Sequence, residues 1–121
     1  MKVLHRGDVV LVRLDPSVGS EIRKTRPAVV VSNDAACRFD AVLQVVPLAG
    51  LPDRELRPYE AHVSGLKPSR AVANQVRTIA KSRIVRRLGH VSPPELRTVD
   101  RALAIQLGLP LTPPGRTPGS P

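Results

Sequence analysis

The chain has 121 residues, enough for one domain with a modest core, and 41% of them are apolar while only 2% are aromatic. This composition excludes a largely disordered chain, and no apolar run approaches the roughly 20 residues of a membrane-spanning helix. The formal net charge of +9 favours a polyanionic partner such as a nucleic acid, although an acidic protein, an acidic membrane surface or a merely solvated arginine-rich face would also fit it.

Five segments have the apolar patterns of short strands. They cover residues 7–14, 27–32, 41–48, 59–65 and 71–79. The charged segment 19–26 joins the first two of these strands, Asn33-Asp34 supplies a turn after the second, and 50–58 forms a loop.

The pattern changes to a helical one near the end of the domain. Residues 81–89 are expected to form a short basic helix that ends at Gly89. A second helix is expected to begin at a capping box over Ser92–Glu95, and to end near Gly108. Its apolar face would be formed by Leu96, Val99, Leu103 and Leu107.

This order of elements predicts a mainly β (α+β) fold, in which a strongly bent small sheet or partly open barrel carries a C-terminal helix. The domain is expected to span residues 1–109. Residues 110–121 are rich in proline and are expected to be disordered.

Cys37 is the single cysteine, which excludes an intramolecular disulfide and agrees with a cytoplasmic location. It follows two alanines with no histidine close by in sequence, a context that favours a small buried side chain over a nucleophile. The start of the chain has no pattern of a secretory signal peptide.

Neither a metal nor a cofactor is expected. His5, His62 and His90 are far apart in sequence, and none has a Cys, Asp or Glu at the spacing of a metal-binding motif. The chain also lacks a glycine-rich phosphate loop and a nucleophile elbow.

The segment 19–26 is the strongest candidate for chemistry in the first half of the domain. It places the carboxylate of Glu21 among Arg23, Lys24 and Arg26. Cleavage of a phosphodiester requires cations that stabilise its negative charge and a base that accepts the proton of an attacking hydroxyl group. A solvated basic turn without chemistry would explain the same composition.

Several sequence blocks together resemble the MazF/PemK toxins. The blocks are RGDVVLVRLDPSVGSE, TRPAVVVSND, VVPL, VSG, NQVRTI and the segment from VSPPEL to LGL, in this order from about Arg6 to Leu109. The resemblance implies an SH3-like β-barrel with a C-terminal helix. It also implies a homodimer that cuts single-stranded mRNA without a metal, by attack of the ribose 2′-OH that leaves a 2′,3′-cyclic phosphate. The implied partner is a cognate antitoxin, whose acidic C-terminal segment would cover the RNA groove.

The resemblance also assigns residues. Arg26 matches the family's catalytic arginine, and Glu21 matches an active-site glutamate that would orient or deprotonate the 2′-OH. We expect Arg26 to stabilise charge, because a guanidinium group keeps its proton at neutral pH and so does not readily accept another as a base. RNA binding is expected from the following residues: Ser20, Arg23, Lys24, Ser64, Gln75 and Arg77. Gln75 could instead satisfy backbone groups near a dimer interface, and Arg77 could instead be a solvated strand residue.

One position departs from the family pattern. After Val45-Val46-Pro47-Leu48 the family usually has Thr or Ser, whose hydroxyl group assists at the scissile phosphate, and this chain has Ala49. The loss of one hydrogen bond to a charged group costs about 1.5–3 kcal/mol. A slower enzyme, a replacement donor from Ser64 or the amide of Gly50, and a loss of catalysis are all compatible with Ala49.

Two further functions therefore stay open on the same scaffold. One is a CcdB-like inhibitor that poisons DNA gyrase by contact alone, although such an inhibitor would not need the Glu21–Arg26 loop. The other is an attenuated RNA-binding protein.

Overall fold

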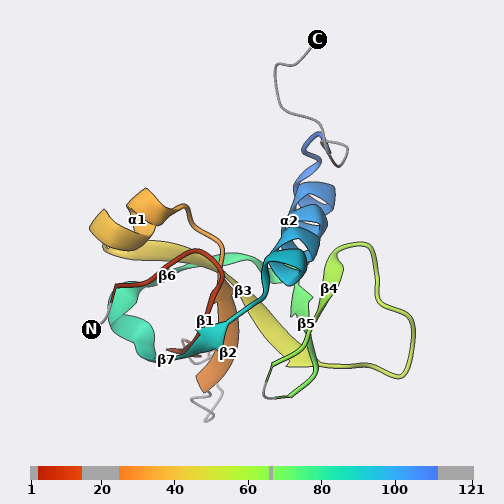
Figure 1. Ribbon diagram of the computed structural model, residues 1–121, viewed down its shortest axis with the longest axis horizontal. Coiled ribbons are helices and arrows are strands. Elements are labelled where there is room, and N and C mark those ends of the chain that lie inside the picture. The colour runs from red at the N-terminus through yellow and green to blue at the C-terminus, as the bar shows by residue number, and fades with distance from the viewer. Residues whose placement is uncertain (1–2, 15–24, 66, 112–121) are drawn as a thin grey trace, which may run out of the picture.

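The structure is a computed structural model that describes residues 3–14, 25–65 and 67–111. This part of the chain forms β-strands, two α-helices and two 3₁₀ turns (Figure 1). In chain order they are β1 (Asp8–Arg13), β2 (Thr25–Val30), α1 (Asp34–Phe39), β3 (Val42–Gly50), β4 (Glu60–Val63), β5 (Ser69–Val72), η1 (Ala73–Gln75), β6 (Arg77–Ala80), η2 (Lys81–Arg83), β7 (Ile84–His90) and α2 (Pro93–Leu107).

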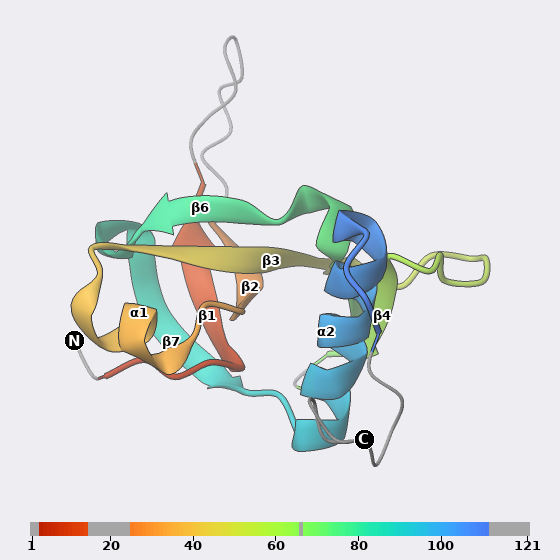
Figure 2. The same cartoon turned by 90° about the horizontal axis from the view of Figure 1, so that it is seen from above.

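The strands form one antiparallel sheet in the order β4-β5-β3-β2-β1-β7, with β6 beside β3. The long strand β3 changes partners along its length (Figure 2). Its first part pairs with β6 and β2, and its last three residues pair with β5. The mainly β fold with a C-terminal helix is thus confirmed. The sheet is bent but, within the described ranges, not closed into a barrel.

Aliphatic side chains form two hydrophobic clusters, as the scarcity of aromatic residues requires. Successive residues of a strand point to opposite faces of the sheet, so neighbouring valines can serve different clusters. Val30 and Val45 belong to the cluster next to α1, whereas Val29 and Val46 belong to the cluster that packs on α2. All four side chains are fully buried. The sheet therefore has a core on each face.

The expected helix over 81–89 is wrong. These residues form η2 and the strand β7, which pairs antiparallel with β1 from Asp8↔His90 to Val12↔Ile84. Ile84 and Val85 are β-branched and lose side-chain freedom in a helix, and pairing with β1 satisfies the backbone hydrogen bonds of this segment.

The strand expected over 71–79 is in fact two strands. β5 ends at Val72, η1 turns the chain, and β6 begins at Arg77. The turn moves the chain from the second half of β3, which pairs with β5, to its first half, which pairs with β6. An apolar pattern does not reveal such a change of partner along one strand.

A turn was expected at Asn33-Asp34, but this pair begins the helix α1. The Asn33 side chain accepts a hydrogen bond from the backbone N–H of Ala36 at 2.8 Å, which caps the helix. Cys37 lies buried in this helix, as expected, and burial raises the pKa of its thiol. A buried thiol with a raised pKa is a poor nucleophile.

The helix α2 is capped by Ser92 at its start and by Gly108 at its end, as predicted. The Ser92 side chain accepts a hydrogen bond from the N–H of Glu95, and Gly108 has the left-handed backbone conformation with φ 70°. Two details differ from the sequence pattern. Glu95 hydrogen-bonds to Ser64 as well as to the cap residue Ser92, and Leu107 is 57% exposed instead of buried. No described helix is long and apolar enough to span a membrane.

Candidate functional site

A cavity of about 440 Å³ opens where β3 changes partners. We call it the arginine cavity, because three guanidinium groups line it. Its lining residues are Leu14, Arg26, Pro47, Leu48, Ala49, Arg70, Val72, Gln75, Arg77. None of these residues is acidic, so the cavity suits an anion.

Four separate segments bring the polar side chains to this cavity. Arg26 lies on β2 opposite Val12 of β1, and Arg77 lies at the start of β6 opposite Val45 of β3. Gln75 is the last residue of η1, and Arg70 lies on β5. Each of these side chains projects from a paired strand or from the tight turn between two strands. The paired strands and this turn therefore fix the positions of the residues that line the cavity.

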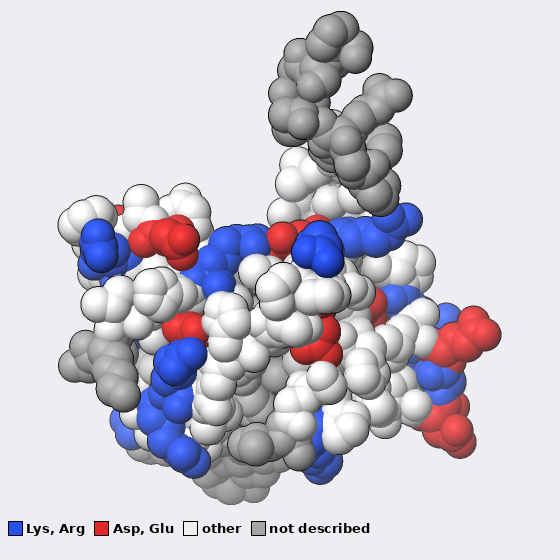
Figure 3. Space-filling model, in the orientation of Figure 1, with Lys and Arg blue, Asp and Glu red and all other residues white. Residues whose placement is uncertain are grey.

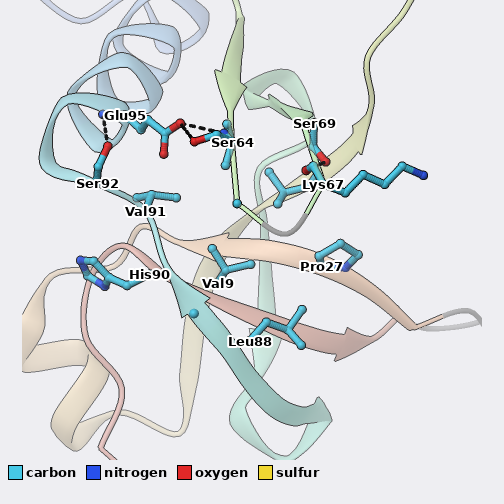
Figure 4. Close-up of a pocket in the computed structure, with 14 residues that line it drawn as sticks. Val9, Pro27, Ser64, Lys67, Ser69, Leu88, His90, Val91, Ser92 and Glu95 are labelled. Atoms are coloured by element: carbon cyan, nitrogen blue, oxygen red, sulfur yellow. Dashed lines mark hydrogen bonds between the residues drawn. The ribbon is translucent and has the colours of Figure 1, made fainter.

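A second cavity, of about 570 Å³, is mostly apolar and lies between the sheet and the start of α2 (Figure 4). We call it the apolar groove. Val9, Pro27 and Leu88 form its floor, and Ser64 and Glu95 face each other at its edge (Figure 4). Glu95 accepts hydrogen bonds from the N–H and the hydroxyl group of Ser64 at 2.7 and 2.6 Å. These bonds lower the pKa of the Glu95 carboxyl group.

The structure brings together three of the residues predicted for the site. Arg26, Gln75 and Arg77 line the arginine cavity, together with Ala49. Ser64 lines the apolar groove instead, and its role in RNA binding stays a prediction. The other predicted residues lie outside the described residues: Ser20, Glu21, Arg23 and Lys24.

Arg70 is the residue of this cavity that the sequence reading missed. Its Cα is paired with that of Ala49 across the β3–β5 ladder. Residues opposite each other in an antiparallel pair have side chains on the same face of the sheet. The register of the two strands would have found Arg70, but the sequence pattern does not establish that register.

A separate polar cluster has a structural role. Asp8 is fully buried and accepts hydrogen bonds from the backbone N–H of His5 at 2.8 Å and from the ring of His90 at 2.9 Å. The Arg87 side chain also contacts its carboxylate, at 3.1 Å. Burial alone would raise the pKa of Asp8, but these bonds outweigh it and lower the pKa. The cluster joins β1 to β7 and to the segment before β1.

Charges of both signs are spread over the face that carries the apolar groove, with no single-sign patch covering it (Figure 3). The net charge alone therefore does not locate an anion site on this face. Within the described ranges, no three His, Cys, Asp or Glu side chains come together as ligands for a metal ion. The metal-free mechanism stays a prediction.

Comparison with known proteins adds an independent observation. Residues 5–107 match the model of the PemK-like, MazF-like toxins of type II toxin-antitoxin systems. The chain belongs to this family. A curated MazF/PemK relative, the endoribonuclease MazF9 of Mycobacterium tuberculosis (strain ATCC 25618 / H37Rv), is 39% identical over 117 residues, covering 88% of this chain and 98% of its own length.

Solved structures of the family have the same fold. An endoribonuclease from Mycobacterial species superimposes with a TM-score of 0.76 at 27% identity, covering 93% of this chain and 98% of the other. A second such endoribonuclease, solved in complex with its cognate antitoxin, gives 0.75 at 26% identity, covering 93% and 100%. A MazE-MazF structure from Deinococcus radiodurans gives 0.77 at 23% identity, covering 91% and 100%, and supports the fold alone.

Proposed function

We propose that this chain cleaves single-stranded RNA at the arginine cavity, by attack of a ribose 2′-OH on the adjacent phosphate and without a metal ion. The family membership makes it a MazF-type toxin endoribonuclease of a toxin-antitoxin system. The observation that carries the proposed site is the convergence of Arg26, Gln75 and Arg77 on one cavity from three separate segments.

In the proposed step, the 2′-oxygen forms a bond to phosphorus while the bond from phosphorus to the 5′-oxygen breaks. The proton of the 2′-OH passes to a base, for which Glu21 is the candidate, and a proton is delivered to the leaving 5′-oxygen. The products are a 2′,3′-cyclic phosphate and a 5′-OH. Arg26 would stabilise the negative charge that develops on the phosphate oxygens. Gln75 and Arg77 would hold the RNA in this cavity. Ser64, in the apolar groove, would add a contact, as would three residues outside the described ranges: Ser20, Arg23 and Lys24.

The partners follow from the family. Family toxins form dimers, and a mycobacterial relative is known in complex with its cognate antitoxin. We expect this chain to act as a homodimer in the cytoplasm, and an antitoxin with an acidic C-terminal segment to block the positively charged site. Such a segment would compete with RNA for the same guanidinium groups.

The test is cleavage of a pool of single-stranded RNA in the presence of a metal chelator. The wild type should cut the pool, and mass spectrometry should find 5′ fragments whose 3′ ends are lighter by one water than a 3′-phosphate, together with 3′ fragments that begin with a 5′-OH. Arg26→Ala should lose at least about 100-fold in rate, as expected for removal of a group that stabilises transition-state charge. RNA that carries 2′-deoxyribose should stay intact, because it lacks the nucleophile.

Two results would contradict the proposal. Cleavage that requires added magnesium would exclude the metal-free step. Retained RNA binding without cleavage by the wild type would favour the attenuated RNA-binding protein, which Ala49 alone suggests.

A further inference from the structure

Arg70 has a place in the arginine cavity that the proposed mechanism does not use. It lines the cavity with Arg26 and Arg77, and its side chain keeps 22% of its surface exposed. Its Nε is buried and lies 3.3 Å from a carboxylate oxygen of Glu60, in a geometry that makes an ion pair but not a hydrogen bond. An arginine has four further N–H groups on its two terminal nitrogens, which can bind a second anion.

Glu60 fixes the position of this arginine. Its side chain is only 2% exposed, on β4 directly beside β5. The carboxylate accepts hydrogen bonds from two nitrogens of Arg54 at 2.8 and 3.0 Å and from the backbone N–H of Arg57 at 2.7 Å. The hydrogen bonds from Arg54, against the opposing effect of burial, lower the pKa of Glu60 to about 2. Glu60 is therefore ionised at neutral pH and can hold Arg70 by charge.

The two arginines that contact Glu60 differ in their position relative to the cavity. Arg70 lines the arginine cavity, whereas Arg54, in the loop before β4, does not. Their different positions give one of them access to a ligand in the cavity.

Ala49 lies directly across the β3–β5 ladder from Arg70. Its methyl group offers no hydrogen-bond donor to an anion in the cavity. The side chain of Arg70 is on the same face of the sheet and supplies charge-assisted donors beside it. The cavity thus has a strong donor next to a position that has none.

We propose that Arg70 binds a backbone phosphate of the RNA substrate in the arginine cavity, and that Glu60 is its positioning residue. The inference rests on the proposed function for the identity of the substrate. It adds a third phosphate-binding arginine, next to Ala49, to Arg26 and Arg77 of the proposed mechanism.

The test measures binding separately from cleavage. A labelled single-stranded oligonucleotide pool with 2′-deoxyribose lacks the nucleophile and reports phosphate binding by fluorescence anisotropy. Arg70→Ala should raise Kd about tenfold, as for the loss of a hydrogen bond to a charged group. It should also reduce the dependence of log Kd on log salt by about 0.7, the value for one phosphate contact on a single strand.

The matched control is Arg54→Ala. It removes the same charge and the other ion-pair partner of Glu60, but no atom of the arginine cavity. It should leave Kd within twofold of the wild-type value. The slope of log Kd against log salt should stay within about 0.2 of the wild-type slope. Arg70→Lys, which keeps the charge but loses the planar fork, should recover part of the affinity. Circular dichroism and thermal unfolding of each variant confirm that the fold is intact.

Glu60 is tested by a double-mutant cycle. Glu60→Gln should weaken binding in the wild type but have no further effect in the Arg70→Ala background, because a positioning residue acts only through its partner. Equal loss of affinity in Arg70→Ala and Arg54→Ala, or wild-type affinity in Arg70→Ala, would overturn the inference. A wild type that binds the pool but cuts no RNA would contradict the proposed function and leave this inference in place.

Discussion

The residue at position 49 is expected to affect the rate of cleavage. Ala49 lies in the arginine cavity next to Arg70. The sequence resemblance leads us to expect a hydroxyl-bearing residue at this position. A hydroxyl group here would donate a hydrogen bond to a phosphate oxygen. This bond would strengthen as negative charge develops on that oxygen in the transition state. The cavity has its cations in place, so one added donor is enough to test the position.

We predict that Ala49→Thr raises kcat about tenfold, the lower end of the effect of one hydrogen bond to a charged group. Single-turnover cleavage of RNA measures this rate. Ala49→Val is the matched control, because valine has nearly the shape of threonine without the hydroxyl group. If both variants change the rate equally, the effect comes from the added volume and the hydroxyl group has no role.

The buried carboxylate of Glu60 makes a prediction about stability in acid. Its pKa is about 2 in the folded protein and near 4.5 when the chain is unfolded, so the unfolded state binds the proton more readily. The stabilisation is complete above about pH 4.5 and is lost as the pH falls toward 2. We therefore expect the free energy of unfolding to fall over this range.

Glu60→Gln isolates this contribution. Urea unfolding of the wild type and of the variant should show the wild type as the more stable at pH 6, and the difference should shrink steadily between pH 4.5 and 2. Asp53→Asn, at an exposed loop position, is the control and should leave the pH profile unchanged. A difference between wild type and Glu60→Gln that does not vary with pH would show that the ion pairs of Glu60 do not stabilise the fold.

At the level of elements, the junction before β1 depends on a glycine. Gly7 has φ 94°, and its backbone hydrogen-bonds to the carbonyl of Val30 and to the N–H of Val91. A Cβ at this position would lie 2.9 Å from the ring of His90, which is itself held by Asp8. Both the backbone conformation and the space around it therefore favour glycine.

We predict that Gly7→Ala lowers the free energy of unfolding by about 2 kcal/mol, mostly from the left-handed backbone. Thermal or urea unfolding measures the loss. Gly89→Ala is the control, because it lies in the neighbouring strand β7 and a Cβ there meets no atom within 4 Å. If Gly89→Ala destabilises the protein as much as Gly7→Ala, the strained backbone is not the cause.

The elements also show what the sequence could predict. The alternating or continuous apolar runs of β1 to β4 and the capped start of α2 depend on local residues, and these elements were predicted in place. β7 and the split between β5 and β6 depend on which strand pairs with which, and so does the presence of Arg70 beside Ala49. Arg26, Gln75 and Arg77 were found through the family resemblance, because their convergence needs the partner change of β3.

For the whole molecule, the position of the positive charges matters more than the net charge of +9. Three arginines converge on one cavity, whereas Arg97 and Arg101 of α2 are exposed on a helix that contributes nothing to that cavity. Exposed charges separated from the bound strand by more than a Debye length, about 8 Å at physiological salt, interact with it only weakly. Most of the affinity for RNA should therefore come from the few cations that touch its phosphates.

The final prediction tests this with a change of charge on α2, which contributes no residue to the lining of the cavity. The double variant Arg97→Ala/Arg101→Ala removes two positive charges and should bind the oligonucleotide pool within about twofold of the wild type at physiological salt. Arg77→Ala removes one charge from the cavity and should weaken binding about tenfold. Fluorescence anisotropy over a range of salt concentrations compares the two. A larger loss in the α2 double variant would mean that RNA reaches across α2, so that the binding surface would extend well beyond the arginine cavity.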